Sequence, residues 1–304
     1  MTLRARLFPS TYGAYLVAMR SHGRVSELPE AGATDHVCWV YAGEGDLDVA
    51  VGRFLDGGLA RGERVMGVGE AVIGSLHRES ARHGGSDALL ARGALETLTL
   101  DEAYAATGEF LPDRQFDFYD AATRRAFADG FTGLRVIAEA SALAADADLR
   151  LELVRWEHLA DNYIAQGPGF TALCAYRADL GEDTLADLSS AHPLVRAPDG
   201  VPEFHVFFDE DRVVLTGSVD TFSAAQLETV LTASPTDGTG TVLDLGLLEF
   251  VDVAGCRVLA RWAQHLNTHG GRLEVTGASR LVQRMWTILA LDGLAPVTFV
   301  GSRP

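Results

Sequence analysis

The turn between a predicted strand and a predicted helix near the C-terminal end carries residues that could do chemistry. Residues 241–262, TVLDLGLLEFVDVAGCRVLARW, indicate a buried strand, a turn at residues 252–255 and an amphipathic helix. The free N–H groups and the positive dipole end of such a helix attract a phosphate or a partner's carboxylate. Covalent phosphorylation needs a hydroxyl group, which Val253 and Ala254 both lack. Function is therefore expected at this turn.

A nucleotide site would be expected in the loop after the predicted strand at residues 36–41. A P-loop there needs the pattern G-x-x-x-x-G-K-[ST], whose lysine reaches the β- and γ-phosphates. The loop reads AGEGDLDVAVGRFL, so it places Glu44, Asp46 and Asp48 where a triphosphate would lie, and the whole chain contains no lysine. ATP hydrolysis by the usual mechanism is therefore excluded at this position.

Three polar residues are candidates for ligand binding: His36, Glu139 and Glu157. Glu139 ends a predicted buried strand, at the edge where open α/β sheets bind ligands. Glu157 lies mid-helix beside an apolar stripe, so a buried ion pair with Arg135 or Arg155 is as good an interpretation as a sensing role. A lone histidine such as His36 is typical of structural hydrogen bonding, and no ligand set with zinc spacing is visible. We therefore predict neither a metal nor a cofactor.

The cysteines are isolated in the sequence. Cys38, Cys174 and Cys256 show no C-x-x-C spacing, which favours three buried reduced thiols over a disulfide or a zinc site. His36, Glu139 and Cys174 all fall near strand ends and could line one pocket. His36 begins its strand whereas Glu139 ends its own, so we expect these two residues on opposite edges of the sheet.

Composition limits the class of protein. A chain of 304 residues most plausibly holds two domains. Its formal net charge is −17 and its arginines form no cluster, which argues against binding to nucleic acid or to anionic membranes. No apolar run approaches the roughly 20 residues that a membrane-spanning helix needs, and the N-terminus lacks the features of a signal peptide. We expect a cytoplasmic protein.

The first domain is predicted at residues 34–198, after a poorly ordered leader at residues 1–33. Short apolar runs alternate with amphipathic segments of helical length, which predicts right-handed βαβ units and a doubly wound, mostly parallel α/β sheet of five strands. The predicted strands are residues 36–41, 64–68, 95–98, 134–140 and 170–176. The predicted helices are residues 46–61, 70–83, 113–129, 148–166 and 183–191.

A second, smaller domain is predicted at residues 203–304, after a linker at residues 199–202 in a segment rich in proline and glycine. Two strands that can form a hairpin come first, and strand–helix units follow, so we expect a mixed sheet with its helices largely on one face.

With the sequence VVLTGSVDTFSAAQL upstream of it, the turn at residues 252–255 resembles that of the STAS domain of anti-sigma factor antagonists. The resemblance implies a protein partner, an anti-sigma factor or a related kinase. In that family the residue after the turn's aspartate is a serine that the kinase phosphorylates, and Val253 occupies this position here. The implied partner-binding residues are Asp220, Asp252, Val253, Ala254 and Gly255.

The first domain resembles the MEDS sensory domain, whose fold is thought to be related to RecA and KaiC. The resemblance rests on the strand with His36 and Cys38, the loop YAGEGDLDVAVGRFLDGGLARGERV, the strand GLRVIAEAS, the helix sequence VRWEHLADNY, the strand TALCAY and the pair His192-Pro193. It implies a domain that senses a small molecule.

Together these observations predict a non-enzymatic signalling regulator in which a ligand-sensing first domain controls partner binding by the second. Two alternatives stay open at this point. One is a RecA-like nucleotide-binding enzyme with a degenerate P-loop. The other is a scaffold in which the second domain mediates homo-oligomerisation.

Overall fold

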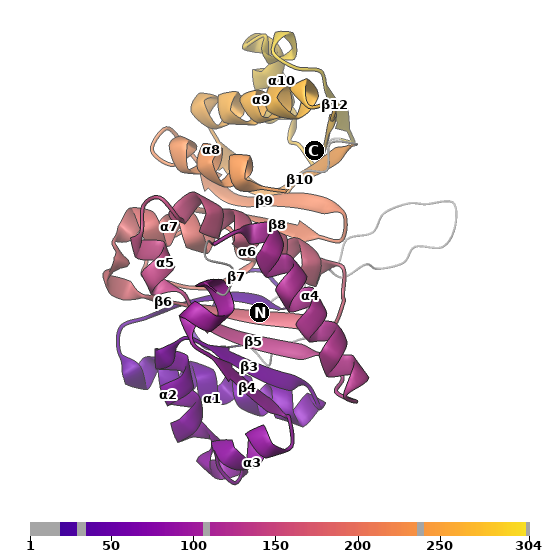
Figure 1. Cartoon of the computed structure of the whole chain (residues 1–304). Helices are drawn as coiled ribbons and strands as arrows, with labels where there is room; N and C mark the ends of the chain where they lie inside the picture. Colours follow the sequence, from indigo (N-terminus) through magenta and orange to yellow (C-terminus); the bar gives the residue numbers. More distant parts are fainter. Residues whose placement is uncertain (1–18, 29–34, 106–109, 236–239, 302–304) are drawn as a thin grey trace.

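A computed structural model of the chain describes residues 19–28, 35–105, 110–235 and 240–301 (Figure 1). Two sheets lie one after the other along the sequence. The first has the strand order β1-β7-β2-β6-β5-β3-β4 and the second the order β12-β11-β10-β9-β8. None of the helices in these ranges is both long and apolar enough to cross a membrane.

The first sheet is built from parallel strand pairs throughout, as predicted for a doubly wound α/β domain. Its elements are β1 (Gly23–Arg24), β2 (His36–Tyr41), α1 (Glu44–Arg61), β3 (Arg64–Val68), α2 (Glu70–Glu79), η1 (Ser80–His83), α3 (Ser86–Ala91), β4 (Leu95–Leu98), η2 (Asp101–Ala105), α4 (Pro112–Ala128), β5 (Leu134–Glu139), α5 (Ser141–Ala145), α6 (Arg150–Ala165), β6 (Phe170–Arg177), η3 (Ala178–Leu180), α7 (Glu182–Ser190) and β7 (Leu194–Arg196).

This sheet has seven strands and not the five that we predicted. Gly23–Arg24 pairs with β7, inside the segment that we expected to be a poorly ordered leader. The rest of that segment, residues 1–18 and 29–33, lies outside the described residues. Strands of two and three residues hold their place through main-chain pairing with their neighbours, and they are too short for an alternation of side chains to mark them in the sequence.

The second sheet is mixed, as predicted. Strands β8 and β9 form an antiparallel pair, and β9, β10, β11 and β12 run parallel. Its elements are β8 (Phe204–Asp209), β9 (Arg212–Val219), α8 (Ala224–Ala233), β10 (Thr241–Val251), α9 (Val253–Thr268), β11 (Leu273–Thr276), α10 (Arg280–Ile288), η4 (Leu291–Gly293) and β12 (Val297–Val300).

Helices cover both faces of the first sheet. Helices α1, α2 and α3 bury one face, where Val37 and Trp39 of β2 point. Helices α4, α6 and α7 cover the opposite face, and Figure 1 shows the second sheet stacked beyond α6 and α7. Because apolar side chains of α6, α7, β8 and α8 join one continuous buried cluster, the two sheets share a core.

A buried ion pair anchors the centre of the first sheet. Arg135 of β5 is fully buried, and its Nε lies 2.5 Å from Oε2 of Glu63. Its guanidinium also stacks on the ring of Phe54, 4.4 Å from the centroid. The pair therefore occupies the site where we had considered Glu157 as the partner of Arg135.

The substitution Glu63→Gln should lower the free energy of unfolding by about 3 to 5 kcal/mol, because it leaves the buried guanidinium of Arg135 without a counter-charge. Urea unfolding of the full chain measures this loss. The matched control is Glu27→Gln, whose ion pair with Arg53 is exposed. That change should cost less than about 1 kcal/mol. Similar small losses in both variants would contradict the role given to Glu63.

Candidate functional site

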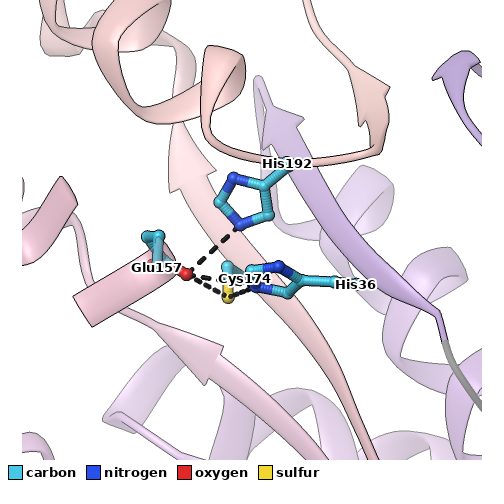
Figure 2. Close-up of side chains that lie close together, drawn as sticks. All are labelled: His36, Glu157, Cys174 and His192. Carbon is cyan, nitrogen blue, oxygen red and sulfur yellow. Dashed lines mark hydrogen bonds and ion pairs between the residues drawn. The ribbon is translucent and has the colours of Figure 1, made fainter. Parts of the chain in front are cut away.

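Four side chains with metal-ligating or titratable groups meet in the interior of the first domain (Figure 2). They come from four separate elements. His36 is the first residue of β2, Cys174 lies in the neighbouring strand β6, Glu157 comes from α6, and His192 follows α7. Their ligand atoms all lie within 4.8 Å of one another. We call these four residues the buried cluster.

The carboxylate of Glu157 is the centre of the buried cluster. Its Oε2 lies 3.2 Å from Nε2 of His36, 3.3 Å from Nε2 of His192 and 3.2 Å from Sγ of Cys174. The Cys174 Sγ is in turn 3.5 Å from Nε2 of His36. No side chain of the four reaches solvent to any useful extent, so these groups interact with one another in a medium of low dielectric.

A second layer of polar groups holds the cluster from outside. The Nδ1 of His36 lies 3.3 Å from Oδ1 of Asp161, and the Nδ1 of His192 lies 2.8 Å from the main-chain oxygen of Leu188. The hydroxyl of Tyr176 donates a short hydrogen bond to Oε1 of Glu157. The orientations of both imidazole rings and of the central carboxylate are therefore fixed.

Neighbouring charges and hydrogen bonds stabilise the ionised carboxylates in this region. Burial alone would raise the pKa of Glu157, but the charges and hydrogen bonds of His192 and His36 outweigh it and hold that pKa well below the usual range. The pKa of Asp161 is likewise lowered, because the charge of Arg20 and the hydrogen bond from His36 outweigh burial. Both carboxyl groups are thus ionised inside the protein.

The pKa values of the two histidines and of the thiol are shifted in different directions. Burial would lower the pKa of His36, but its hydrogen bonds to Asp161 and Glu157 raise it. For His192, burial and the nearby charge of His36 lower the pKa. Burial and the charge of Glu157 raise the pKa of Cys174 well above that of an ordinary thiol.

A cleft of about 630 Å³ opens at the carboxyl ends of β2, β3 and β6, away from the buried cluster. Apolar and small residues line it together with carboxylates and arginines: Tyr41, Ala42, Gly43, Glu44, Leu47, Glu70, Ala71, Gly74, Arg78, Arg177, Ala178 and Asp179. These arginines are already paired, Arg78 with Asp48 and Arg177 with Asp179. Such a cleft suits a small ligand with an apolar body better than a polyanion.

Glu139 lies next to this cleft and not in the buried cluster. The hydroxyl of Tyr41 donates to Oε1 of Glu139 over 3.2 Å. In the sheet, Glu139 is level with Ala175, whereas His36 is level with Ala172. The two residues therefore lie toward opposite ends of β2 and β5, the strands on either side of β6, and of these two only His36 shares the site of Cys174.

Helix α6 connects the buried cluster to the second sheet. Oδ2 of Asp161 accepts a 2.7 Å hydrogen bond from the main-chain N–H of Phe208 in β8. The Nε2 of His158 lies 3.1 Å from the main-chain oxygen of Val230 in α8. Arg20 contacts both sides, since its guanidinium binds Asp161 and the main-chain oxygen of Phe208.

In the second sheet, Asp252 joins two loops. Its Oδ1 accepts a 2.9 Å hydrogen bond from the N–H of Gly255 and so caps α9, while its Oδ2 accepts a 2.8 Å hydrogen bond from Thr221. Asp252 is therefore the N-cap residue of α9. Gly255 is needed there, because a Cβ at this position would lie 2.6 Å from a methyl group of Val251.

Three exposed apolar side chains lie close in the sequence to Thr221 and Asp252. Phe222, next to Thr221, is 93% exposed, and Val253, at the first position of α9, is 39% exposed. Phe250, two residues before Asp252, is 53% exposed. Asp220 orders the first loop by accepting hydrogen bonds from the N–H groups of Phe222 and Ser223. We call Phe222, Phe250 and Val253 the apolar patch.

The comparisons with known proteins agree with this architecture. Residues 35–193, more than half of the chain, match the family described as the MEthanogen/methylotroph, DcmR Sensory domain, MEDS. The chain belongs to the MEDS family. Residues 207–298 match a second family, described as Mlab, STAS domain. Both resemblances seen in the sequence are thereby confirmed, and the two sheets are called the MEDS and STAS domains from here on.

A crystal structure of an anti-sigma factor antagonist from Mycobacterium paratuberculosis is also similar. The identity is 24%, the match covers 31% of this chain and 83% of that chain, and the TM-score is 0.26. No curated protein matches the chain.

The structure corrects one interpretation within the MEDS domain. Glu157 is buried, as we considered, but its partners are His36 and His192 and not Arg135 or Arg155. The side chains of His36, Glu157, Cys174 and His192 also converge into a set of potential metal ligands that no sequence spacing indicated. Sequence spacing missed this set since each ligand comes from a different element. The adjacency of β2 and β6, which carry His36 and Cys174, was the available signal.

In the STAS domain, Asp252→Ala should lower the free energy of unfolding by about 0.5 to 2 kcal/mol, because the first turn of α9 loses its N-cap. Asp252→Asn keeps an acceptor for the N–H of Gly255 and should lose clearly less. Urea unfolding of the full chain measures both variants. Equal losses would mean that the charge of Asp252, and not its capping hydrogen bond, stabilises the turn.

Proposed function

We propose that this chain is a signalling regulator whose STAS domain binds another regulatory protein, an anti-sigma factor or a related kinase, without phosphorylation of its turn. The observation that carries the proposal is the apolar patch. It lies beside a well-capped helix N-terminus at which Val253 and Ala254 offer no hydroxyl. A side chain such as Phe222, with 93% of its surface in water, is costly unless a partner covers it in use.

Electrostatics are consistent with a protein partner. The chain carries a formal net charge of −17, and Asp220 and Asp252 flank the apolar patch. An apolar centre with a charged rim is the usual composition of a protein interface. A partner that presents apolar side chains and basic residues would match it. The proposed contact residues are therefore those expected from the sequence, namely Asp220, Asp252, Val253, Ala254 and Gly255, together with Phe222 and Phe250.

The MEDS domain is proposed to control this binding. Its cleft would accept a small ligand near Glu139, and α6 would transmit the change, since Asp161 and His158 both contact the STAS domain. A coupling free energy of about 1 to 3 kcal/mol is typical of such regulation, so the ligand needs only a modest preference for one arrangement. In this proposal the domains are residues 34–198 and 203–304, the regulator is cytoplasmic, and it is not an enzyme.

The substitution Val253→Asp tests the proposed interface. A carboxylate at the first position of α9 suits the helix dipole, so the fold should persist, but it places a charge in the apolar patch. The matched control is Val49→Asp, a similarly exposed valine of α1 in the MEDS domain. The full chain should retain an anti-sigma factor or kinase from native lysate as wild type and as Val49→Asp, and at least tenfold less as Val253→Asp.

Equal retention of that partner by both variants would contradict the proposal. Light scattering on the same three proteins measures their oligomeric state and so tests the alternative that the STAS domain is a scaffold. If the wild type and Val49→Asp form oligomers that Val253→Asp does not, then the apolar patch binds a second copy of the chain and not a foreign regulator.

A further inference from the structure

The hydrogen bonds around the buried cluster determine where the imidazole protons lie. The main-chain oxygen of Leu188 can only accept, so Nδ1 of His192, 2.8 Å away, carries the hydrogen. The Nε2 of a neutral His192 is then a lone pair, and it faces the carboxylate of Glu157 at 3.3 Å. That Nε2 has no hydrogen-bond partner among the described residues. Two acceptors facing each other in the interior repel unless a proton or a metal cation lies between them.

His36 is held in the same way. Its Nδ1 points at the carboxylate of Asp161, which is ionised and can only accept, so the hydrogen belongs on Nδ1. The Nε2 of His36 then offers its lone pair toward Glu157 and Cys174. Two imidazole nitrogens, one carboxylate oxygen and one sulfur atom therefore converge on one point (Figure 2).

We propose that His36, Glu157, Cys174 and His192 bind a divalent transition-metal ion of the zinc type. Ligand bonds of about 2.0 to 2.3 Å in a tetrahedron place neighbouring ligand atoms roughly 3.3 to 3.6 Å apart. Four of the six separations between the ligand atoms run from 3.2 to 3.5 Å, and all six lie within 4.8 Å. This mixture of imidazole, thiolate and carboxylate suits zinc and disfavours calcium and magnesium, which prefer oxygen ligands.

The second layer also fits a metal centre. Imidazoles that bind a metal commonly donate their other N–H to a carboxylate or a main-chain oxygen, the roles that Asp161 and Leu188 fill here. The ligating carboxylate is itself hydrogen-bonded by Tyr176. A metal ion would also supply the positive charge that turns the Cys174 thiol into a thiolate despite its burial.

Four protein ligands that are all buried leave no position for a substrate, so the ion has a structural role. It would fix α6 to β2 and β6 and to the segment just before the STAS domain. The inference is independent of the proposed function, because the ion binds whether or not the STAS domain has a partner.

The experiment uses the full-length chain without an affinity tag. Metal is measured by mass spectrometry after dialysis against a weak chelator, and the metal-free protein is then loaded with Co²⁺ and its absorption spectrum is recorded. We expect about one equivalent of zinc per chain. With Co²⁺ we expect a thiolate charge-transfer band in the near ultraviolet and the strong visible bands of a tetrahedral site.

Two cysteine-to-serine variants locate the site. Cys174→Ser should abolish the charge-transfer band and weaken zinc binding at least tenfold. Cys38→Ser is the matched control, because Cys38 is equally buried and lies opposite Cys174 in the neighbouring strand, but it is not a ligand. It should leave the band and the zinc content unchanged. Circular dichroism reports whether each variant is folded.

The proposal is overturned if folded wild-type protein takes up less than a tenth of an equivalent of zinc or Co²⁺ from an excess. It is also overturned if the band persists in folded Cys174→Ser. Should Cys174→Ser fail to fold, the wild-type Co²⁺ spectrum alone decides, since absence of the thiolate band excludes this ligand set. If the proposal is overturned, the cluster is a hydrogen-bonded ion pair. Nitrogen NMR of the metal-free wild type is then expected to show His36 protonated on both ring nitrogens.

Discussion

The buried carboxylate of Asp161 is the interaction on which the arrangement of the two domains depends. It has no exposure to solvent, yet it accepts from the N–H of Phe208 in the STAS domain, from Arg20 before the MEDS domain and from His36 within it. An ionised group in the interior is tolerated only when several donors converge on it. Movement of β8 against α6 would remove the donor of Phe208 from this charge, so this contact opposes separate movement of the two domains.

Helix α6 extends this constraint to the rest of the molecule. Glu157 and Asp161 are four residues apart and therefore project from the same face of the helix, one turn after the other. Glu157 holds the buried cluster, and Asp161 holds the edge strand of the STAS domain. A change in the cluster therefore reaches the second sheet through one turn of helix, with no flexible segment in between.

The sequence predicted the repeating units better than the contacts between them. Strands at residues 36–41 and 170–176 follow from their continuous apolar runs, and the cap by Asp252 follows from its place before an amphipathic helix, because both are local patterns. The partners of Glu157 could not be predicted in this way, since they lie in β2 and after α7 and meet it only when the sheet has formed. The short strands β1 and β7 were missed because two or three residues show no periodicity.

The residues of the STAS turn explain why the contacts of α6 with the STAS domain would matter for the proposed function. Where a serine accepts phosphate, one covalent event adds nearly two negative charges and can end binding by itself. Val253 and Ala254 cannot provide that event, so the affinity of the apolar patch has to be set by the position and order of the STAS domain. The contacts of Asp161 and His158 with β8 and α8 are the described hydrogen bonds from α6 to that domain. Control by a ligand or a metal in the MEDS domain would therefore act through them.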